Sequence, residues 1–118
     1  MTKIEWVKQL TETCKKAGTY QPFFNDIIDQ LAQILEIRDN ATAEFEKSGN
    51  NPVVTYTNKG GHSNVVKNPA LVIINECNQQ ALAYWRELGL TPAGYKKLKP
   101  EEADKDTSFE DVLSRIGV

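Results

Sequence analysis

The chain has 118 residues and a formal net charge of −2, with 14 Lys and Arg against 16 Asp and Glu. This length suits one domain, and 40% hydrophobic with 25% charged residues is ordinary for a globular protein. The sequence excludes a membrane-spanning helix, because no segment approaches the roughly 18 consecutive apolar residues that a bilayer requires. The charged, amphipathic segment 1–10 is unlike a secretory signal peptide, so we expect a cytoplasmic protein.

The charge is unevenly divided along the chain. Residues 1–98 carry 11 Lys and Arg against 10 Asp and Glu, whereas residues 99–118 carry 3 against 6. A single copy with this balance would bind a polyanion weakly, but an assembly would repeat each basic patch and sum the fields. The sequence therefore predicts a domain at residues 1–98, followed by an acidic tail at residues 99–118.

Two amphipathic helices are predicted in the first half of the chain. Three-and-four spacing of apolar residues predicts a helix from Thr2 to Ala17, which Gly18 ends. A second helix is predicted from Pro22 to about Lys47. Its apolar stripe consists of Phe24, Ile27, Ile28, Leu31, Ile34, Leu35, Ala41 and Phe45. At 1.5 Å per residue this helix is roughly 35–40 Å long. We therefore expect its C-terminal end to pack against another helix or another subunit.

A β-hairpin is predicted at about residues 53–66. Residues 53–57 are β-branched or aromatic, as strands prefer. Gly60 and Gly61 supply the positive φ angles of a two-residue turn. The cross-strand pairs expected from that turn are Tyr56 with Val65 and Thr55 with Val66. A lone hairpin is marginal in water, so it should pack on the helices or pair with a neighbouring chain.

A third helix is predicted to begin after Asn68, which caps it, with Pro69 at the first helical position. Its apolar stripe consists of Ala70, Leu71, Ile74, Cys77, Ala81, Leu82, Tyr84, Trp85 and Leu88. Gly89 ends this helix, and Thr91 caps a short one from Pro92 to about Leu98. The predicted fold is mainly α, with two long antiparallel helices and an N-terminal helix around a core, and a small hairpin between the second and third helices.

The acidic tail contains a short apolar stripe. Phe109, Val112, Leu113 and Ile116 fall at i, i+3, i+4 and i+7, which is one face of a helix. Either this stripe docks on a partner protein, or it folds back onto its own body or a neighbouring subunit.

Residues suited to catalysis or metal binding are sparse. His62 is the single histidine, and no cysteine stands near it at ligand spacing, so we expect no metal and no cofactor. Cys14 and Cys77 fall on apolar helix faces and fit buried free thiols better than a disulfide or a Cys–His pair. The glycines after Lys59 lack the rest of a phosphate-binding loop. We therefore expect a protein that is not an enzyme.

The order of motifs in residues 50–98 is distinctive. Asn-Pro-Ala at residues 68–70 opens the helix that runs through Trp85, and Leu-Gly-Leu-Thr-Pro follows at residues 88–92, ahead of Leu98. With the helical pair and the Gly- and Asn-rich hairpin before it, this order resembles the phage terminase small-subunit family.

The chain departs from the family pattern just after that corner. Where the family usually carries a small residue and then an arginine, this chain has Gly94 and Tyr95. Lys96 and Lys97 follow, so positive charge is kept. Lysine is a point charge and does not make the bidentate contacts of arginine, so the geometry of any DNA contact differs.

The resemblance implies a non-catalytic phage or prophage component of viral genome packaging, in the host cell cytoplasm. Members of the family assemble as rings, recognise double-stranded viral DNA and regulate the large subunit, which holds the ATPase and nuclease. The candidate DNA contacts are Tyr95, Lys96, Lys97 and Lys99 at the corner, and Lys8, Lys15 and Lys16 on the first helix. The candidate docking residues for the large subunit are Phe109, Val112, Leu113 and Ile116.

Two other functions stay open on the sequence. One is a small DNA-binding regulator that uses the Gly18–Pro22 or the Gly89–Pro92 corner as a helix-turn-helix. The short last helix and the nearly neutral body weigh against it. The other is a helical assembly adaptor that binds no nucleic acid.

Overall fold

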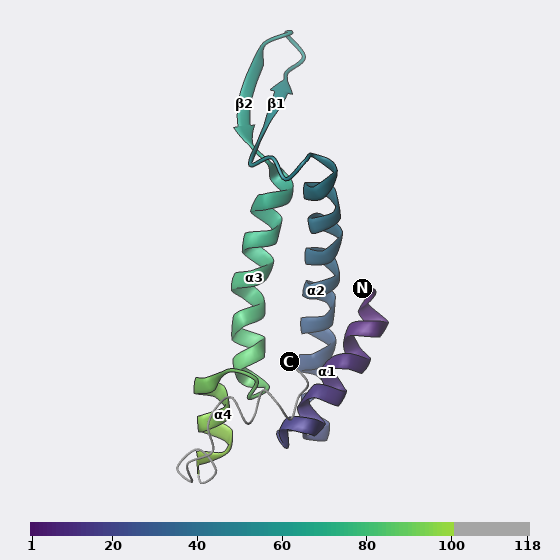
Figure 1. The fold of residues 1–118 in the computed structure, drawn as a ribbon, viewed down its shortest axis with the longest axis vertical. Coiled ribbons are helices and arrows are strands. Elements are labelled where there is room, and N and C mark those ends of the chain that lie inside the picture. Colours follow the sequence, from purple (N-terminus) through teal and green to yellow (C-terminus); the bar gives the residue numbers. More distant parts are fainter. Residues whose placement is uncertain (101–118) are drawn as a thin grey trace.

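A computed structural model describes residues 1–100 of the chain. Its elements are helix α1 (Lys3–Ala17), the 3-10 turn η1 (Pro22–Phe24), helix α2 (Asn25–Lys47), strands β1 (Val53–Thr57) and β2 (Ser63–Lys67), and helices α3 (Pro69–Glu87) and α4 (Pro92–Leu98). The structure confirms the predicted fold, which is mainly helical with a two-stranded antiparallel hairpin between the second and third helices (Figure 1). The tail beyond residue 100, with its predicted apolar stripe, lies outside the described residues.

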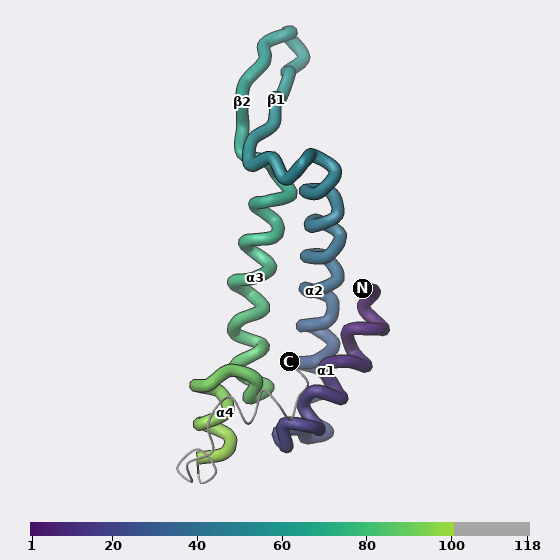
Figure 2. Tube along the Cα trace, in the orientation of Figure 1, coloured from purple at the N-terminus to yellow at the C-terminus, as the bar shows by residue number. Residues whose placement is uncertain are grey.

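The molecule is elongated, with extents of 63 × 27 × 20 Å. Helices α2 and α3 run antiparallel and side by side, and α1 packs antiparallel against the first half of α2 (Figure 1). The hairpin extends beyond one end of the α2–α3 pair, and α4 lies at the opposite end, beside the last turn of α3 (Figure 2). The chain therefore has a hairpin end and an α4 end, which are far apart.

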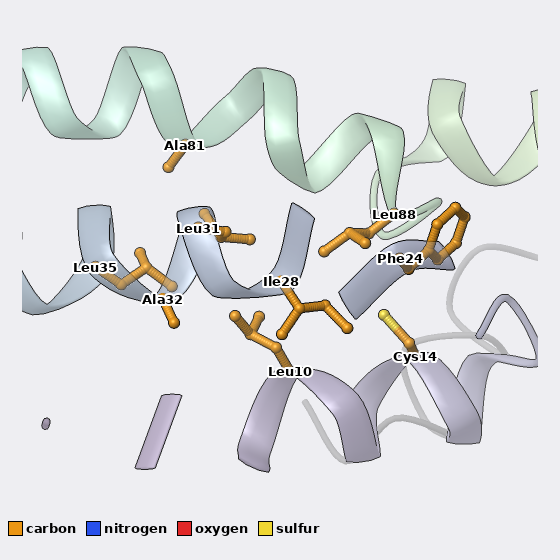
Figure 3. Packing of buried hydrophobic residues seen from close by; sticks show 9 residues of the cluster. All are labelled: Leu10, Cys14, Phe24, Ile28, Leu31, Ala32, Leu35, Ala81 and Leu88. Carbon is orange, nitrogen blue, oxygen red and sulfur yellow. The ribbon is translucent and has the colours of Figure 1, made fainter. Parts of the chain in front are cut away.

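The buried core lies toward the α4 end. Apolar side chains from α1, η1, α2 and α3 meet there, and the cluster consists of Leu10, Cys14, Phe24, Ile28, Leu31, Ala32, Leu35, Ala81 and Leu88 (Figure 3). Each large apolar side chain that is fully buried contributes roughly 1.5–3 kcal/mol. The half of the α2–α3 pair nearer the hairpin buries fewer apolar side chains. Among the described residues, Ala41 and Cys77 are the buried apolar residues there.

Helix α1 is held to α2 by polar contacts as well as by the core. Thr2 and Glu5 form a capping box at its start. The indole nitrogen of Trp6 donates to Asp39 at 2.8 Å, and the Arg38 guanidinium both pairs with Asp39 at 3.2 Å and lies over the Trp6 ring. Burial disfavours the charged carboxylate, but the hydrogen bonds from Trp6, from the terminal amine and from Arg38 outweigh it, so the pKa of Asp39 lies below its ordinary value.

The predicted hairpin register is wrong by one residue. The observed pairs are Thr55 with Val65 and Tyr56 with Asn64. The loop is longer than two residues because the Asn58 side-chain oxygen accepts hydrogen bonds from Gly60 N at 2.9 Å and from His62 N at 3.0 Å. Gly61, with a φ of +80°, then completes a three-residue loop. Tyr56 and Val65 therefore lie on opposite faces of the hairpin instead of facing each other.

The base of the hairpin is fixed by one buried polar residue. Asn68 caps α3 by accepting from Ala70 N at 3.0 Å, as predicted. Its side-chain amide also donates to Ser48 Oγ at 3.1 Å and to the Asn51 carbonyl at 2.9 Å. These bonds tie the end of α2 to the start of α3, so the hairpin is anchored at its base.

The rest of the hairpin is exposed. Tyr56 is 59% exposed and Val65 is 71% exposed, and no helix covers either face in this single chain. Of the two alternatives predicted for the hairpin, packing on the helices of its own chain is not what the structure shows, and pairing with a neighbouring chain stays a prediction. Among residues 1–100, no helix is both long enough and apolar enough to cross a membrane.

Replacing Asp39 with Asn tests how α1 is held. Because the folded pKa of Asp39 is depressed, its charge stabilises the fold above its unfolded pKa of about 3.9. That contribution is lost as the pH falls through the folded pKa. We expect Asp39→Asn to lower the free energy of unfolding at pH 7 by roughly 1–2 kcal/mol, as for a weakened charged hydrogen bond. In urea titrations followed by tryptophan fluorescence, the difference from the unaltered protein should shrink at pH 3; a constant difference would contradict this account.

Candidate nucleic-acid interface

Basic side chains from three helices gather at the α4 end. Lys15 and Lys16 occupy the last turn of α1, Arg86 the last turn of α3, and Lys96 and Lys97 the last turn of α4. Cations near helix C-termini are favoured by the helix dipole. These residues are exposed, so their charges face the solvent at one end of the molecule.

The corner between α3 and α4 sets the direction of α4. Leu88 is fully buried in the core, so the end of α3 is fixed. Gly89 has a φ of +73°, and a Cβ there would lie 2.7 Å from Leu98 Cδ1 and 2.9 Å from Thr19 Cγ2. Only glycine combines this backbone conformation with such close packing. The corner is therefore pressed against both the end of α4 and the segment that follows α1.

Helix α4 is held against the last turn of α3. Thr91 caps it by accepting a hydrogen bond from Gly94 N at 3.0 Å, and Pro92 occupies the first position, as the sequence predicted. A Cβ on Gly94 would overlap the backbone carbonyl oxygen of Arg86, so the two helices approach more closely than any larger residue permits. The next residue, Tyr95, is only 4% exposed.

The position of Tyr95 changes the predicted set of DNA contacts. Its ring is packed inside the chain, so in this conformation it cannot stack on a nucleotide base. The residue that stands in place of the family's arginine thus serves packing. The neighbouring Lys96 and Lys97 side chains are exposed, and Lys97 lies with Arg86 and Glu87 along a shallow groove between α3 and α4.

The fold brings together two groups of lysines that are far apart in sequence. The ammonium of Lys99 lies 3.9 Å from where a Cβ on Gly18 would be, directly after α1. The Lys15 ammonium, in the last turn of α1, lies 5.1 Å from the centre of the Tyr20 ring. Lys8 lies two turns earlier on α1, farther from the corner. The candidates Lys15, Lys16, Lys96, Lys97 and Lys99 therefore share one end of the molecule, which we call the basic end.

Arg86 is a member of the basic end that the sequence analysis did not single out. It lies in the last turn of α3, a helix whose apolar spacing predicted core packing and no binding site. Its position next to α4 depends on how the corner between the two helices folds. The described acids at this end are Glu12 on α1, Asp26 in the first turn of α2, and Glu87. Among the described residues the cations outnumber them there, which leaves a modest positive surface.

The cysteines and the histidine form no cluster within residues 1–100. Burial raises the pKa of the Cys14 thiol to about 11, so it is protonated at neutral pH and is a poor nucleophile. Cys77 is also a buried free thiol, as predicted. His62 lies in the hairpin loop, at the opposite end from Cys14 (Figures 1 and 3). Within residues 1–100, no group of three or more His, Cys, Asp or Glu side chains is arranged to hold a metal ion.

The family model for the small subunit of phage terminase matches residues 3–105, which is most of the chain. The chain belongs to this family. The match includes every described helix, the hairpin and the basic end. Membership supports a role as the small subunit in phage DNA packaging, with DNA and the large terminase subunit as the partners that the family implies. No curated protein and no solved structure matches the chain.

Gly94→Ala tests whether α4 is held by close backbone approach. The added methyl group meets the Arg86 carbonyl, which is backbone and cannot rotate away. We expect a loss of about 1–3 kcal/mol in the free energy of unfolding, as for other overpacked sites. Gly60→Ala is the matched control, because its nearest contacts are at ordinary distances of 3.4 and 3.5 Å and its φ is not positive. Equal urea midpoints for the two variants would contradict the packing of α4 described above.

Proposed function

We propose that this terminase small subunit is a non-catalytic DNA-recognition protein that assembles from several copies, as a ring, and regulates the large ATPase and nuclease subunit in the host cytoplasm. The observation that carries the proposal is the basic end: Lys15, Lys16, Lys96, Lys97 and Lys99 share one end of a family member whose net charge is −2, and Lys99 lies beside the end of α1. Six of the twelve Lys and Arg residues in the described part of the chain lie at this one end: Lys15, Lys16, Arg86, Lys96, Lys97 and Lys99. Local concentration lets a slightly acidic protein attract DNA phosphates.

The chemistry of these residues suits phosphate contacts more than base recognition. Lysine ammoniums on exposed helix ends reach the DNA backbone, which gives affinity and salt dependence but carries no sequence information. With Tyr95 buried, Arg86 is the one described side chain of the basic end with a planar, bidentate fork. We therefore propose that one copy binds DNA weakly, and that affinity comes from several basic ends acting together.

Exposed apolar side chains support assembly from several copies. The hairpin presents Val53, Tyr56, Val65 and Val66, and the helices present Ile37, Ile73 and Leu82. A two-stranded hairpin has little stability of its own, and here neither face is covered by its own chain. We propose that a neighbouring copy covers the hairpin, which extends the α2–α3 pair and is anchored through Asn68.

The mass in solution tests assembly directly. We expect light scattering at micromolar concentration to give a mass of several chains, whereas a mass of one chain would contradict the proposal. Tyr56→Ser combined with Val65→Ser should lower the mass, because it removes exposed apolar groups from both faces of the hairpin. Ile4→Ser is the control: Ile4 is 82% exposed on α1, away from the hairpin, and the mass should stay unchanged.

Charge reversal tests the basic end. We expect Lys96→Glu with Lys97→Glu to weaken duplex DNA binding by on the order of tenfold or more, and to reduce the slope of log K against log salt by about two. Lys59→Glu with Lys67→Glu makes the same change in net charge at the hairpin end and should have a smaller effect, compared at a protein concentration at which light scattering gives both variants the same mass. The measurement is the affinity of each double variant for duplex DNA, by fluorescence anisotropy at several salt concentrations. If the first variant binds normally, the lysines of α1 become the better candidates.

A further inference from the structure

An apolar pocket opens beside the basic end. Its volume is about 420 Å³, and it lies between the segment that joins α1 to α2 and the end of α4. Phe23 and Phe24 form one wall, with their rings 5.0 Å apart in an edge-to-face contact. Leu98 and Lys99 form the other. Phe23 is 72% exposed although it sits beside a buried aromatic residue, so it presents a large uncovered apolar surface at the pocket.

The chain itself passes this pocket immediately before its tail begins. Leu98 and Lys99 line the pocket, and residues 101–118 follow directly after Pro100. Phe109 is ten residues beyond Lys99, which an extended chain spans with up to roughly 33–36 Å. The apolar stripe at residues 109–116 can therefore reach the pocket of its own chain without strain.

The tail also matches the charge around the pocket. The six acids of the tail are Glu101, Glu102, Asp104, Asp106, Glu110 and Asp111. Lys99 lines the pocket, and Lys15, Lys16, Lys96 and Lys97 lie at the same end of the molecule. An apolar stripe preceded by acids fits an apolar pocket beside lysines, both by burial and by charge.

We propose that residues 109–116 of the tail dock in the pocket between Phe23 and Leu98 of the same chain. This docking places the acidic segment 101–106 across the basic end. The tail is then an internal competitor for the lysines that would contact DNA. Release of the tail frees both the apolar stripe and the cations. The docking stands on the pocket alone, whereas the competition with DNA rests on the function proposed above.

Disulfide cross-linking in the full chain tests the docking. Gln21 lines the pocket, so Gln21→Cys is paired with Ser108→Cys, which precedes the apolar stripe and leaves it and Phe23 intact. Cys14 and Cys77 are buried and do not compete. Under mild oxidation we expect this pair to close on the order of tenfold faster than the control pair of Gln9→Cys, exposed on α1, with Ser108→Cys. Adding Phe23→Ser to the first pair should bring its rate down to that of the control.

The mass of the cross-linked product on a non-reducing gel shows whether the tail occupies the pocket of its own chain or that of another copy. A product with the mass of one chain supports docking in the same chain. A product with the mass of two chains would overturn it, because the tail would then occupy the pocket of another copy. Equal rates for the two pairs would also overturn it, because the tail would then have no preference for the pocket.

DNA binding by the full chain tests the competition. Phe23→Ser should raise the affinity for duplex DNA by roughly three- to tenfold and steepen its salt dependence, since the acidic segment no longer covers the lysines. Ile4→Ser, which changes another highly exposed apolar residue, on α1, should leave the affinity unchanged. An unchanged affinity for Phe23→Ser alongside a fast cross-link would overturn the competition and leave the docking in place. Absence of DNA binding in all variants, with the cross-link intact, would contradict the proposed function and not the docking.

Discussion

The close contact between the end of α3 and the segment after α1 is the constraint on which the basic end depends. Leu88 is fully buried, Gly89 brings the backbone against Thr19, and Gly94 lets α4 lie on the Arg86 carbonyl. Larger side chains at either glycine would move α4 away. The lysines of α4 would then separate from those of α1, although no charged residue had changed. The electrostatics of this end thus follow from backbone packing in the core beside it.

The two ends of the molecule leave different chemistry exposed. The α4 end holds most of the buried core and presents cations together with the exposed Phe23, whereas the hairpin end buries few apolar residues and presents valines and a tyrosine. Exposed apolar surface favours contact with another protein, and clustered ammonium groups favour phosphates. This division agrees with the proposal that copies meet through the hairpin and helices while the basic ends face DNA.

Net charge alone gives a poor description of this chain. The value of −2 combines a body that is close to neutral with an acidic tail. Within the body the acids line α2, where Asp29 pairs with Lys3 and Asp39 holds Trp6 and Arg38. Those carboxylates take part in holding α1 in place. The exposed lysines of the basic end carry most of the positive charge that remains available to a polyanion.

The sequence by itself determined the helices, the hairpin and most of their limits, because caps and stop signals act locally; the start of α2 is an exception, since Pro22–Phe24 form a 3-10 turn and α2 begins at Asn25. Thr2, Asn68 and Thr91 cap helices through bonds to residues two or three positions away, and Gly18 ends α1 in a left-handed conformation. The hairpin register escaped prediction because a single side chain, Asn58, lengthened the loop by forming its own backbone bonds. Only the tertiary structure decided that Tyr95 is buried and that Lys99 meets the end of α1. A helix of seven residues is too short for its pattern to reveal which face packs, and contacts between distant segments depend on how the corner folds.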